Sequence, residues 1–359
     1  MKTKEIKEKL LAKRESRTPK PTDYVSTGST LLNMAITGNP NWGFAKGHYY
    51  HFVGDSESGK TWFCLTCFAE AMRNPNFKDY RIIHDDVEGG ALMDMRKFFG
   101  ETVAERIEAP RMVKEEPVYS RTIEDFYYNV DDAIKDGRPF IYVCDSMDGL
   151  QTDAEERKFD ENKKAYRQGK ELKGSYGMSK PKQNSAGMPS IVSRIKETGS
   201  ILIIISQTRD NVSPMSMGGK TNSGGHALKF YAGLQIWSSV KGLIEKNVKG
   251  KKRQIGKLAK VRVKKNRITG RDRTVFIPFF HSYGIDDTRS CITYLVSEGH
   301  WKKKQGKIEA PEFDFTGKED ALIRHIEDKK MVKDLKDLVA DVWNEIEKAC
   351  EVKRAPRYV

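Results

Sequence analysis

Short apolar runs alternate with amphipathic stretches along most of the chain before Gly233. Four of the apolar runs are rich in β-branched and aromatic residues, which is typical of central strands: Tyr49–Val53, Arg81–His84, Phe140–Cys144 and Ile201–Ile205. Helical patterns lie between them, at Lys60–Arg73 and after the capping-box sequence Thr122–Asp125. The alternation predicts an α/β fold whose mostly parallel central sheet is covered by helices on both faces.

After Gly233 the pattern changes to strands separated by turns. We expect strands at Leu234–Val240, Leu258–Lys265 and Thr274–Phe280, the last two forming a basic β-hairpin around residues 268–271. Beyond residue 298 the pattern is short, charged and helical, and Lys330–Cys350 is expected to form one amphipathic helix. The chain therefore divides into an N-terminal arm (1–24), a core (25–298) and a small helical C-terminal domain (299–359).

One stretch of the core, residues 151–187, is polar and rich in Lys, Gln, Gly and Ser. It is longer than an ordinary connection between two elements. We expect a loop there that is either functional or disordered.

Composition agrees with a folded chain, since 38% of the 359 residues are hydrophobic and 10% are aromatic. No apolar run reaches the roughly 20 residues of a membrane-spanning helix. The basic N-terminus lacks the apolar centre of a signal peptide, so we expect a cytoplasmic protein with no membrane partner. The five cysteines are scattered. Cys64 and Cys67 form a CxxC pair on a predicted helix, where core packing is favoured over a metal or redox site.

The net charge of +14 favours a polyanionic partner, although a basic protein can also simply be soluble. Its distribution is more informative. Between Lys241 and Arg273 there are 14 basic and two acidic residues, a local net charge of +12. This concentration favours DNA or phosphate binding.

A glycine-containing motif follows the first predicted strand and precedes the first helix. It matches G-x-x-x-x-G-K-[ST], with the residues Gly54, Asp55, Ser56, Glu57, Ser58, Gly59, Lys60 and Thr61. Its backbone N–H groups can wrap phosphates, Lys60 can neutralise the β- and γ-phosphates, and the Thr61 hydroxyl can bind Mg²⁺. The motif predicts a P-loop that binds ATP and Mg²⁺.

Carboxylates follow two of the predicted strands. Asp145 ends the strand Phe140–Cys144, where it can order Mg²⁺, and the alternative is a carboxylate that only caps the strand. Hydrolysis also needs a group that positions the attacking water. Glu88 is our candidate, and the residues alone leave Asp85 and Asp86 as alternatives.

The last central strand is followed by Gln207, which can sense a γ-phosphate through a neutral hydrogen bond. The glycine- and serine-rich segment 208–223 comes next, and Gly224-Gly225 then open a predicted helix at His226–Ala232. A polar loop that begins at a phosphate sensor and ends at a helix start suits a switch that grips a nucleic-acid backbone. An ordinary surface loop is the alternative.

With these residues in view, the chain resembles the RecA family of homologous-recombination ATPases across roughly residues 25–300. Four segments are similar to the family's: Val25–Ser29, the P-loop Gly54–Thr61, Cys144–Ser146 and Gly224–Tyr231. The last of them resembles the segment that closes the family's second DNA-binding loop. The resemblance implies a RecA-like P-loop ATPase core.

The resemblance also implies roles for individual residues. Glu88 would activate water and Gln207 would sense the γ-phosphate. Segments 151–187 and 208–223 would be the first and second DNA-binding loops. The implied DNA-binding residues are Arg209, Lys220, Asn222, Ser223, Gly224 and Gly225. Val263–Ile268 is similar to a segment that reaches the neighbouring subunit's ATP, so Lys265 and Arg267 would act in trans, and the N-terminal arm would pack on the next protomer.

Three departures from the family pattern stand out. The first loop is longer than expected, Met95 stands about where the family stacks a tyrosine on adenine, and the C-terminus ends without an acidic tail. They indicate a virus-encoded or otherwise distant member.

The function implied is a DNA-dependent ATPase and recombinase. It would form helical filaments on single-stranded DNA and pair that strand with double-stranded DNA during recombination and repair. The alternatives are a hexameric helicase or ring ATPase on the same fold, and a non-catalytic ATP-binding mediator.

Overall fold

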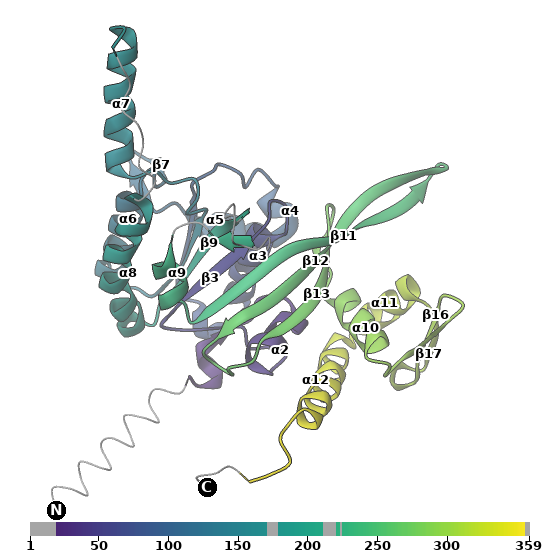
Figure 1. The fold of residues 1–359 in the computed structure, drawn as a ribbon. Coiled ribbons are helices and arrows are strands. Elements are labelled where there is room, and N and C mark those ends of the chain that lie inside the picture. The colour runs from purple at the N-terminus through teal and green to yellow at the C-terminus, as the bar shows by residue number, and fades with distance from the viewer. Residues whose placement is uncertain (1–18, 171–178, 211–219, 223–224, 356–359) are drawn as a thin grey trace, which may run out of the picture. The chain divides into compact units, whose positions relative to one another are not determined.

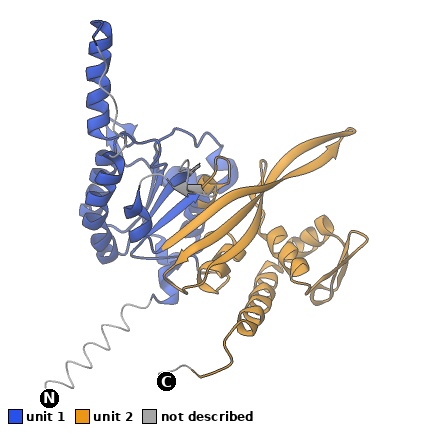
Figure 2. Ribbon diagram, in the orientation of Figure 1, with its two compact units in different colours: residues 1–26, 43–53, 64–233 blue, residues 27–42, 54–63, 234–359 orange. Residues whose placement is uncertain are grey.

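The computed structural model describes residues 19–170, 179–210, 220–222 and 225–355, with the backbone alone at 209–210 and 220–222 (Figure 1). The chain forms two compact units (Figure 2). Unit 1 comprises residues 1–26, 43–53 and 64–233, and unit 2 comprises residues 27–42, 54–63 and 234–359. Each unit is therefore assembled from segments that are far apart in the sequence.

Unit 1 contains the sheet that the apolar runs predict. Its strands are ordered β3 (His48–Gly54), β9 (Ile201–Asp210), β8 (Phe140–Asp145), β4 (Arg81–Asp86) and β5 (Ile107–Glu108). β9, β8, β4 and β5 pair in parallel. The registers place Asp86 opposite Asp145, so the carboxyl ends of β4 and β8 lie level. The predicted α/β fold with a mostly parallel sheet is confirmed.

Helices complete the core of unit 1. α3 (Lys60–Arg73) and α6 (Ile123–Lys135) begin and end close to where their signals predict, and Thr122 caps α6 in a capping box. α6 and α8 (Ser179–Thr198) bury apolar side chains in one cluster with β8, and α9 (His226–Tyr231) joins that cluster through Leu228. The remaining elements are η1 (Pro21–Asp23), β1 (Tyr24–Val25), β2 (Phe44–Ala45), η2 (Pro75–Phe77), α4 (Met95–Phe99), α5 (Glu101–Arg106), β6 (Arg111–Val113), β7 (Glu116–Val118), α7 (Asp153–Arg167) and β10 (Lys220–Asn222).

Two expected loops of unit 1 differ from the sequence prediction. Residues 151–187 contain α7 and the first half of α8 instead of one long loop. The expected loop 208–223 begins as a hairpin, because β9 continues to Asp210 and β10 pairs with it antiparallel. Residues 171–178, 211–219 and 223–224 lie outside the described residues, as do residues 1–18 of the expected N-terminal arm.

Unit 2 contains an antiparallel sheet ordered β14 (Gly284–Ile285), β13 (Arg273–Phe280), β12 (Lys251–Asn266) and β11 (Leu234–Val248), with α2 (Thr30–Thr37) packed against β12 and β13. The predicted hairpin between β12 and β13 is confirmed. β11 and β12 are much longer than predicted and form a second hairpin, which turns at Lys249-Gly250 with positive φ at both residues. Their paired ends extend beyond β13 (Figure 1).

The C-terminal part of unit 2 mixes helices with a small sheet. The helices α10 (Asp287–Ser297), α11 (Glu319–Asp328) and α12 (Val332–Ala349) contact one another. The antiparallel strands β15 (Lys302–Lys304), β16 (Lys307–Ala310) and β17 (Phe315–Lys318) form the sheet, with η3 (Pro311–Phe313) before β17, and α11 packs against β16 and β17. The amphipathic helix predicted over Lys330–Cys350 is confirmed as α12. The small sheet corrects the all-helical expectation, because strands this short show no alternation that reveals them.

Candidate functional site

In the P-loop of unit 2, the lysine side chain is hydrogen-bonded to the backbone of the loop itself. Lys60 donates from Nζ to the carbonyl oxygens of Gly54 at 3.0 Å and Asp55 at 2.7 Å, and its side chain is buried. Ser58 donates from Oγ to the Asp55 carbonyl at 2.7 Å. Backbone carbonyls are neutral partners, so the ammonium group can exchange them for phosphate oxygens.

The two glycines of the motif are required for different reasons, Gly54 by a close contact and Gly59 by its backbone conformation. A Cβ on Gly54 would lie 2.4 Å from the Ser238 carbonyl oxygen and 2.7 Å from Ser58 Oγ, and Gly59 has a φ of +89°. Ser238, on β11, also accepts the Asp55 N–H at 3.2 Å and donates from Oγ to the Ser58 carbonyl at 2.5 Å. The backbone cradle therefore fits a phosphate group. Ser238 is a supporting residue that the sequence did not reveal.

The rest of the motif differs in exposure. Ser56 and Glu57 are exposed, whereas Asp55 and Thr61 are half-buried. Glu57 has a φ of +59° and forms an ion pair with Lys257 of β12, and this hydrogen-bonded ammonium lowers the pKa of the Glu57 carboxyl. The P-loop is thus tied to the basic hairpin at Glu57 as well as to β11 at Ser238.

In unit 1 the candidate catalytic glutamate and the candidate phosphate sensor are in contact. Gln207 donates from Nε2 to Glu88 Oε1 at 3.2 Å, and the Ser146 hydroxyl donates to the same oxygen. The Glu88 N–H also points to the Asp145 carbonyl, at 3.4 Å. Glu88 follows β4, Ser146 follows β8, and Gln207 lies in β9 just beyond its parallel pairing with β8, so the sheet gathers them at its carboxyl edge. Ser146 is a further residue that the sequence analysis did not assign.

The three carboxylates of the β4 turn have different partners. Asp85 is fully buried and accepts hydrogen bonds from Ser120 N–H at 2.9 Å, Ser120 Oγ at 2.5 Å and Tyr142 Oη at 2.7 Å. Burial raises the pKa of Asp85. Asp86 accepts the N–H groups of Gly90 at 3.0 Å and Ala91 at 3.2 Å, which folds the following loop.

Glu88, in contrast, is exposed. The hydrogen bonds to Glu88 both end on Oε1. Asp85 and Asp86, in contrast, accept hydrogen bonds at both carboxylate oxygens. The Glu88 carboxylate therefore has room for a water molecule. The geometry therefore favours Glu88 among the three alternatives.

Asp145 lies beside a buried histidine. His84 Nε2 is 3.8 Å from Asp145 Oδ2, and the histidine is 6% exposed. The peptide bond between Asp145 and Ser146 is cis. No group of three or more His, Cys, Asp or Glu side chains able to hold a metal occurs within the described ranges. Thr61 and Asp145 remain our candidates for a Mg²⁺ that phosphates would also hold.

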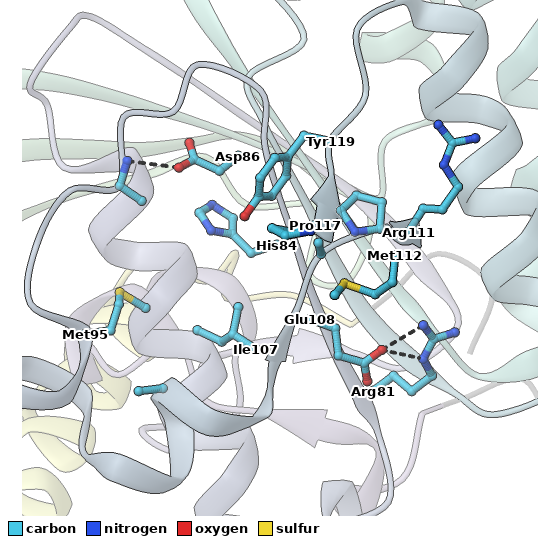
Figure 3. Close-up of a pocket in the computed structure, with 14 residues that line it drawn as sticks. Arg81, His84, Asp86, Met95, Ile107, Glu108, Arg111, Met112, Pro117 and Tyr119 are labelled. Atoms are coloured by element: carbon cyan, nitrogen blue, oxygen red, sulfur yellow. Dashed lines mark hydrogen bonds and ion pairs between the residues drawn. The ribbon is translucent and has the colours of Figure 1, made fainter. Parts of the chain in front are cut away.

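Met95, expected near the adenine, lines a cavity of about 600 Å³ at the edge of the unit 1 sheet (Figure 3). His84, Asp86 and Tyr119 also line it, together with the Arg81–Glu108 ion pair at 2.8 Å. Burial raises the pKa of Tyr119. The cavity combines a thioether, an aromatic ring and charged groups.

Lys265 and Arg267, expected to act in trans, flank a turn at the end of β12. Lys265 is half-buried and Arg267 is exposed. The buried Asn266 between them fixes the turn, since its Nδ2 donates to the Ile36 carbonyl at 2.8 Å and its Oδ1 accepts the Ile268 N–H at 2.9 Å. Asn266 therefore attaches this turn to α2 between the two cations.

The candidate DNA-binding residues are described in part. The backbones of Arg209, Lys220 and Asn222 lie in the β9–β10 hairpin, where Arg209 pairs with Thr221. Ser223 and Gly224 lie outside the described residues. Gly225 immediately precedes α9 with a φ of +84°.

Comparison with known proteins points in one direction. The RecA N-terminal domain family matches residues 166–286. Proteins named RecA match 78% of this chain, beginning with that of Lactococcus lactis subsp. cremoris (strain MG1363) at 26% identity over 283 residues. The resemblance to the RecA family is confirmed. RecA of Chlorobaculum tepidum is 25% identical over 285 residues, and that of Ureaplasma parvum serovar 3 is 25% identical over 279 residues.

The RecA-like relatives are longer than the matched part of this chain. The chain spans 65% of the length of the Lactococcus protein, 71% of the Chlorobaculum protein and 74% of the Ureaplasma protein. Among the residues described, no helix has the length and apolar character needed to cross a membrane. Cys64 and Cys67 are buried, reduced thiols within α3, which agrees with core packing.

Proposed function

We propose that this chain is an ATP-dependent DNA recombinase of the RecA type. The observation that carries the proposal is the hydrogen bond between Gln207 and Glu88 at the carboxyl edge of the unit 1 sheet. A phosphate sensor in contact with a water-activating carboxylate links the state of a nucleotide to its hydrolysis. The RecA-like relatives and the P-loop geometry support the same reading.

The P-loop is proposed to bind the phosphates. Lys60 would exchange the Gly54 and Asp55 carbonyls for phosphate oxygens, and Thr61 and Asp145 would hold Mg²⁺. Bound Mg²⁺ would supply positive charge next to the phosphate oxygens. Glu88 would orient water and accept its proton. Glu88 Oε1 already accepts two hydrogen bonds, so it gains room for water when Gln207 turns away towards a phosphate.

Assembly is proposed to complete the site. Lys265 and Arg267 would reach the nucleotide of a neighbouring protomer and stabilise charge that develops during hydrolysis. Their position on either side of the hydrogen-bonded Asn266 supports such a reach. The predicted consequence is a helical filament in which each interface carries one active site.

DNA binding is proposed for two regions. The first consists of the segments 151–187 and 208–223 with Gly224 and Gly225. The second is the basic arm, which we define as the tip of the β11–β12 hairpin, residues 245–254. All residues of the basic arm are exposed, and it carries five cations against one acid: Lys246, Lys249, Lys251, Lys252 and Arg253 against Glu245. Such a surface suits a phosphate backbone.

The test combines two measurements on the full chain. ATP hydrolysis should rise when single-stranded DNA is added, and electron microscopy with ATP and that DNA should show extended filaments. Closed rings would favour the helicase alternative. ATP binding without hydrolysis, with neither filaments nor rings, would favour a mediator and contradict the recombinase.

A further inference from the structure

The turn after β8 contacts both the candidate catalytic residues and the start of α8. Ser146, at its beginning, donates to Glu88. Asp148, two residues later, accepts the backbone N–H of Gln207 at Oδ2, at 2.7 Å. The Asp148 carbonyl accepts a hydrogen bond from Lys180 Nζ at 3.3 Å. Asp148 thus holds the end of β9 with its side chain and the start of α8 with its backbone.

The start of α8 is packed tightly against Gly225, the residue immediately before α9. A Cβ on Gly225 would lie 2.9 Å from Pro181 Cβ, and Gly225 has a φ of +84° that other residues rarely adopt. Glycine therefore allows an approach here that a larger residue would block. Because Pro181 follows Lys180 directly, a displacement of α8 at Lys180 also acts on Gly225.

These contacts form one continuous path within unit 1. It runs from Glu88 through Gln207 to Asp148, and from there through Lys180 and Pro181 to Gly225. One end is the candidate hydrolysis site. At the other end Pro181, in the α8 portion of the first segment proposed to bind DNA, contacts Gly225, which is proposed to bind DNA with the second.

We propose that Asp148 is a positioning residue that couples the nucleotide state at Gln207 to DNA binding at the α8–α9 junction. The proposal rests on the proposed function, since it needs both ligands. The hydrogen bond from the Gln207 N–H to the Asp148 carboxylate is charge-assisted. It holds the Gln207 backbone in place while the Gln207 side chain changes its partner. When that side chain moves from Glu88 to a phosphate, Asp148 transmits the shift of β9 to the turn and to Lys180.

Contacts alone do not establish coupling, so the test measures it directly. The quantity is the ratio of the DNA affinity with a bound ATP analogue to the DNA affinity without it. The affinity of the full chain for a labelled oligothymidylate is measured with and without a non-hydrolysable ATP analogue and Mg²⁺. The parent should bind the oligonucleotide more tightly with the analogue. Asp148→Ala should lower that ratio about fivefold or more, the lower end of typical coupling between two sites.

Two variants separate coupling from a general loss of structure. Asp148→Asn keeps an oxygen that can accept the Gln207 N–H, so it should retain most of the parental ratio. Asp79→Ala removes an exposed aspartate in the turn before β4 and should match the parent. Asp148→Ala itself should keep the parental thermal midpoint and the parental affinity for the analogue in the absence of DNA.

Lys180 supplies an independent arm of the test. Lys180→Met should lower the same ratio, and Lys180→Arg should preserve it. The ratio is informative even if Lys180 touches DNA, because a direct contact changes both affinities together.

Three results would overturn the inference. The first is a parental ratio in Asp148→Ala, which leaves the proposed function intact. The second is a loss of analogue binding together with a lowered thermal midpoint, which would assign Asp148 a purely structural role. The third is a parent whose DNA affinity does not respond to the analogue, which would contradict the proposed function as well.

Discussion

Gln207 Nε2 donates a hydrogen bond to Glu88 Oε1 across 3.2 Å, although the two residues are 119 positions apart in the chain. The Gln207 amide cannot turn to a bound nucleotide without breaking this bond. In the proposed function this bond would link the phosphate sensor to the water-activating group. This relationship is the basis of the proposed ATPase cycle and of the predictions that follow.

Lys60→Ala should abolish nucleotide binding. The ammonium group is buried among carbonyl oxygens of the P-loop and is the cation that the motif offers to the β- and γ-phosphates. Isothermal titration calorimetry with ATP and Mg²⁺ measures the affinity directly. Lys46→Ala, a lysine outside the P-loop, serves as the control. An affinity for ATP close to the parent's would show that the P-loop is not the phosphate site.

Acid should weaken the attachment of α12 to β13. The buried Glu347 accepts hydrogen bonds from Arg273 and is also paired with Arg271, and the Arg273 hydrogen bond lowers the pKa of the Glu347 carboxyl. Because the folded-state pKa is lowered, this stabilisation is present above the ordinary glutamate pKa of about 4.3 and is lost as the pH falls below it.

Thermal midpoints of the parent and of Glu347→Gln over a range of pH check this. Near neutral pH the free energy of unfolding of the variant should be lower than the parent's by about 1–2 kcal/mol. This loss is smaller than for a fully buried ion pair, because both arginines are partly exposed. The difference should shrink as the pH falls below about 4. Glu345→Gln, an exposed position on the same helix, should behave as the parent. A difference that does not depend on pH would contradict the ion-pair explanation.

Binding to single-stranded DNA should depend steeply on salt and little on sequence, since the proposed interactions are mostly with phosphates. Removing three cations of the basic arm, in Lys251→Ala/Lys252→Ala/Arg253→Ala, should reduce the slope of log affinity against log salt by about 2, at roughly 0.7 for each phosphate that is no longer neutralised. Fluorescence anisotropy at several salt concentrations measures the slope. ATP affinity should stay unchanged. An unaltered slope would remove the basic arm from the DNA interface.

Mixed assemblies test whether Lys265 and Arg267 act in trans. Glu88→Gln protein keeps its cations, and Lys265→Ala/Arg267→Ala protein keeps its glutamate. At an interface where the second variant supplies the nucleotide site and the first supplies the cations, a complete site is rebuilt. ATP hydrolysis should therefore reappear in the mixture. No recovery, with mixed filaments verified by a label on each variant, would mean that the cations do not act across the interface.

Sequence patterns predicted the central strands and the P-loop because buried parallel strands are continuous apolar runs and the motif is local. They missed α7, which has no buried residue and so shows no apolar stripe. Its local signals were the capping box of Thr152 and Glu155, acidic residues in the first turn and basic residues in the last. The predicted strand ended at His84, whereas β4 continues to Asp86. Aspartate is unfavourable in strands, so the sequence did not indicate the last two residues.

The other residues that the sequence analysis missed have partners that are distant along the chain. Asp85 belongs to β4 because Ser120 and Tyr142, distant in sequence, satisfy its carboxylate. The hydrogen bonds of Ser238 with the P-loop and of Asp148 with Gln207 arise in the same way. The fold brings such partners together, and the hydrophobic periodicity of the segments that contain them does not indicate the contact.

The central claim is that Glu88 activates the water that hydrolyses ATP, and one comparison tests it most directly. ATP turnover with single-stranded DNA is measured for the parent, Glu88→Gln and Asp86→Asn, with ATP affinity measured in parallel. Glu88→Gln should bind ATP as the parent does and turn it over more slowly by a factor on the order of 10² to 10⁴. Asp86→Asn, which alters a carboxylate bound to Gly90 and Ala91, should be affected far less. The opposite order, with Asp86→Asn nearly inactive and Glu88→Gln close to the parent, would contradict the assignment.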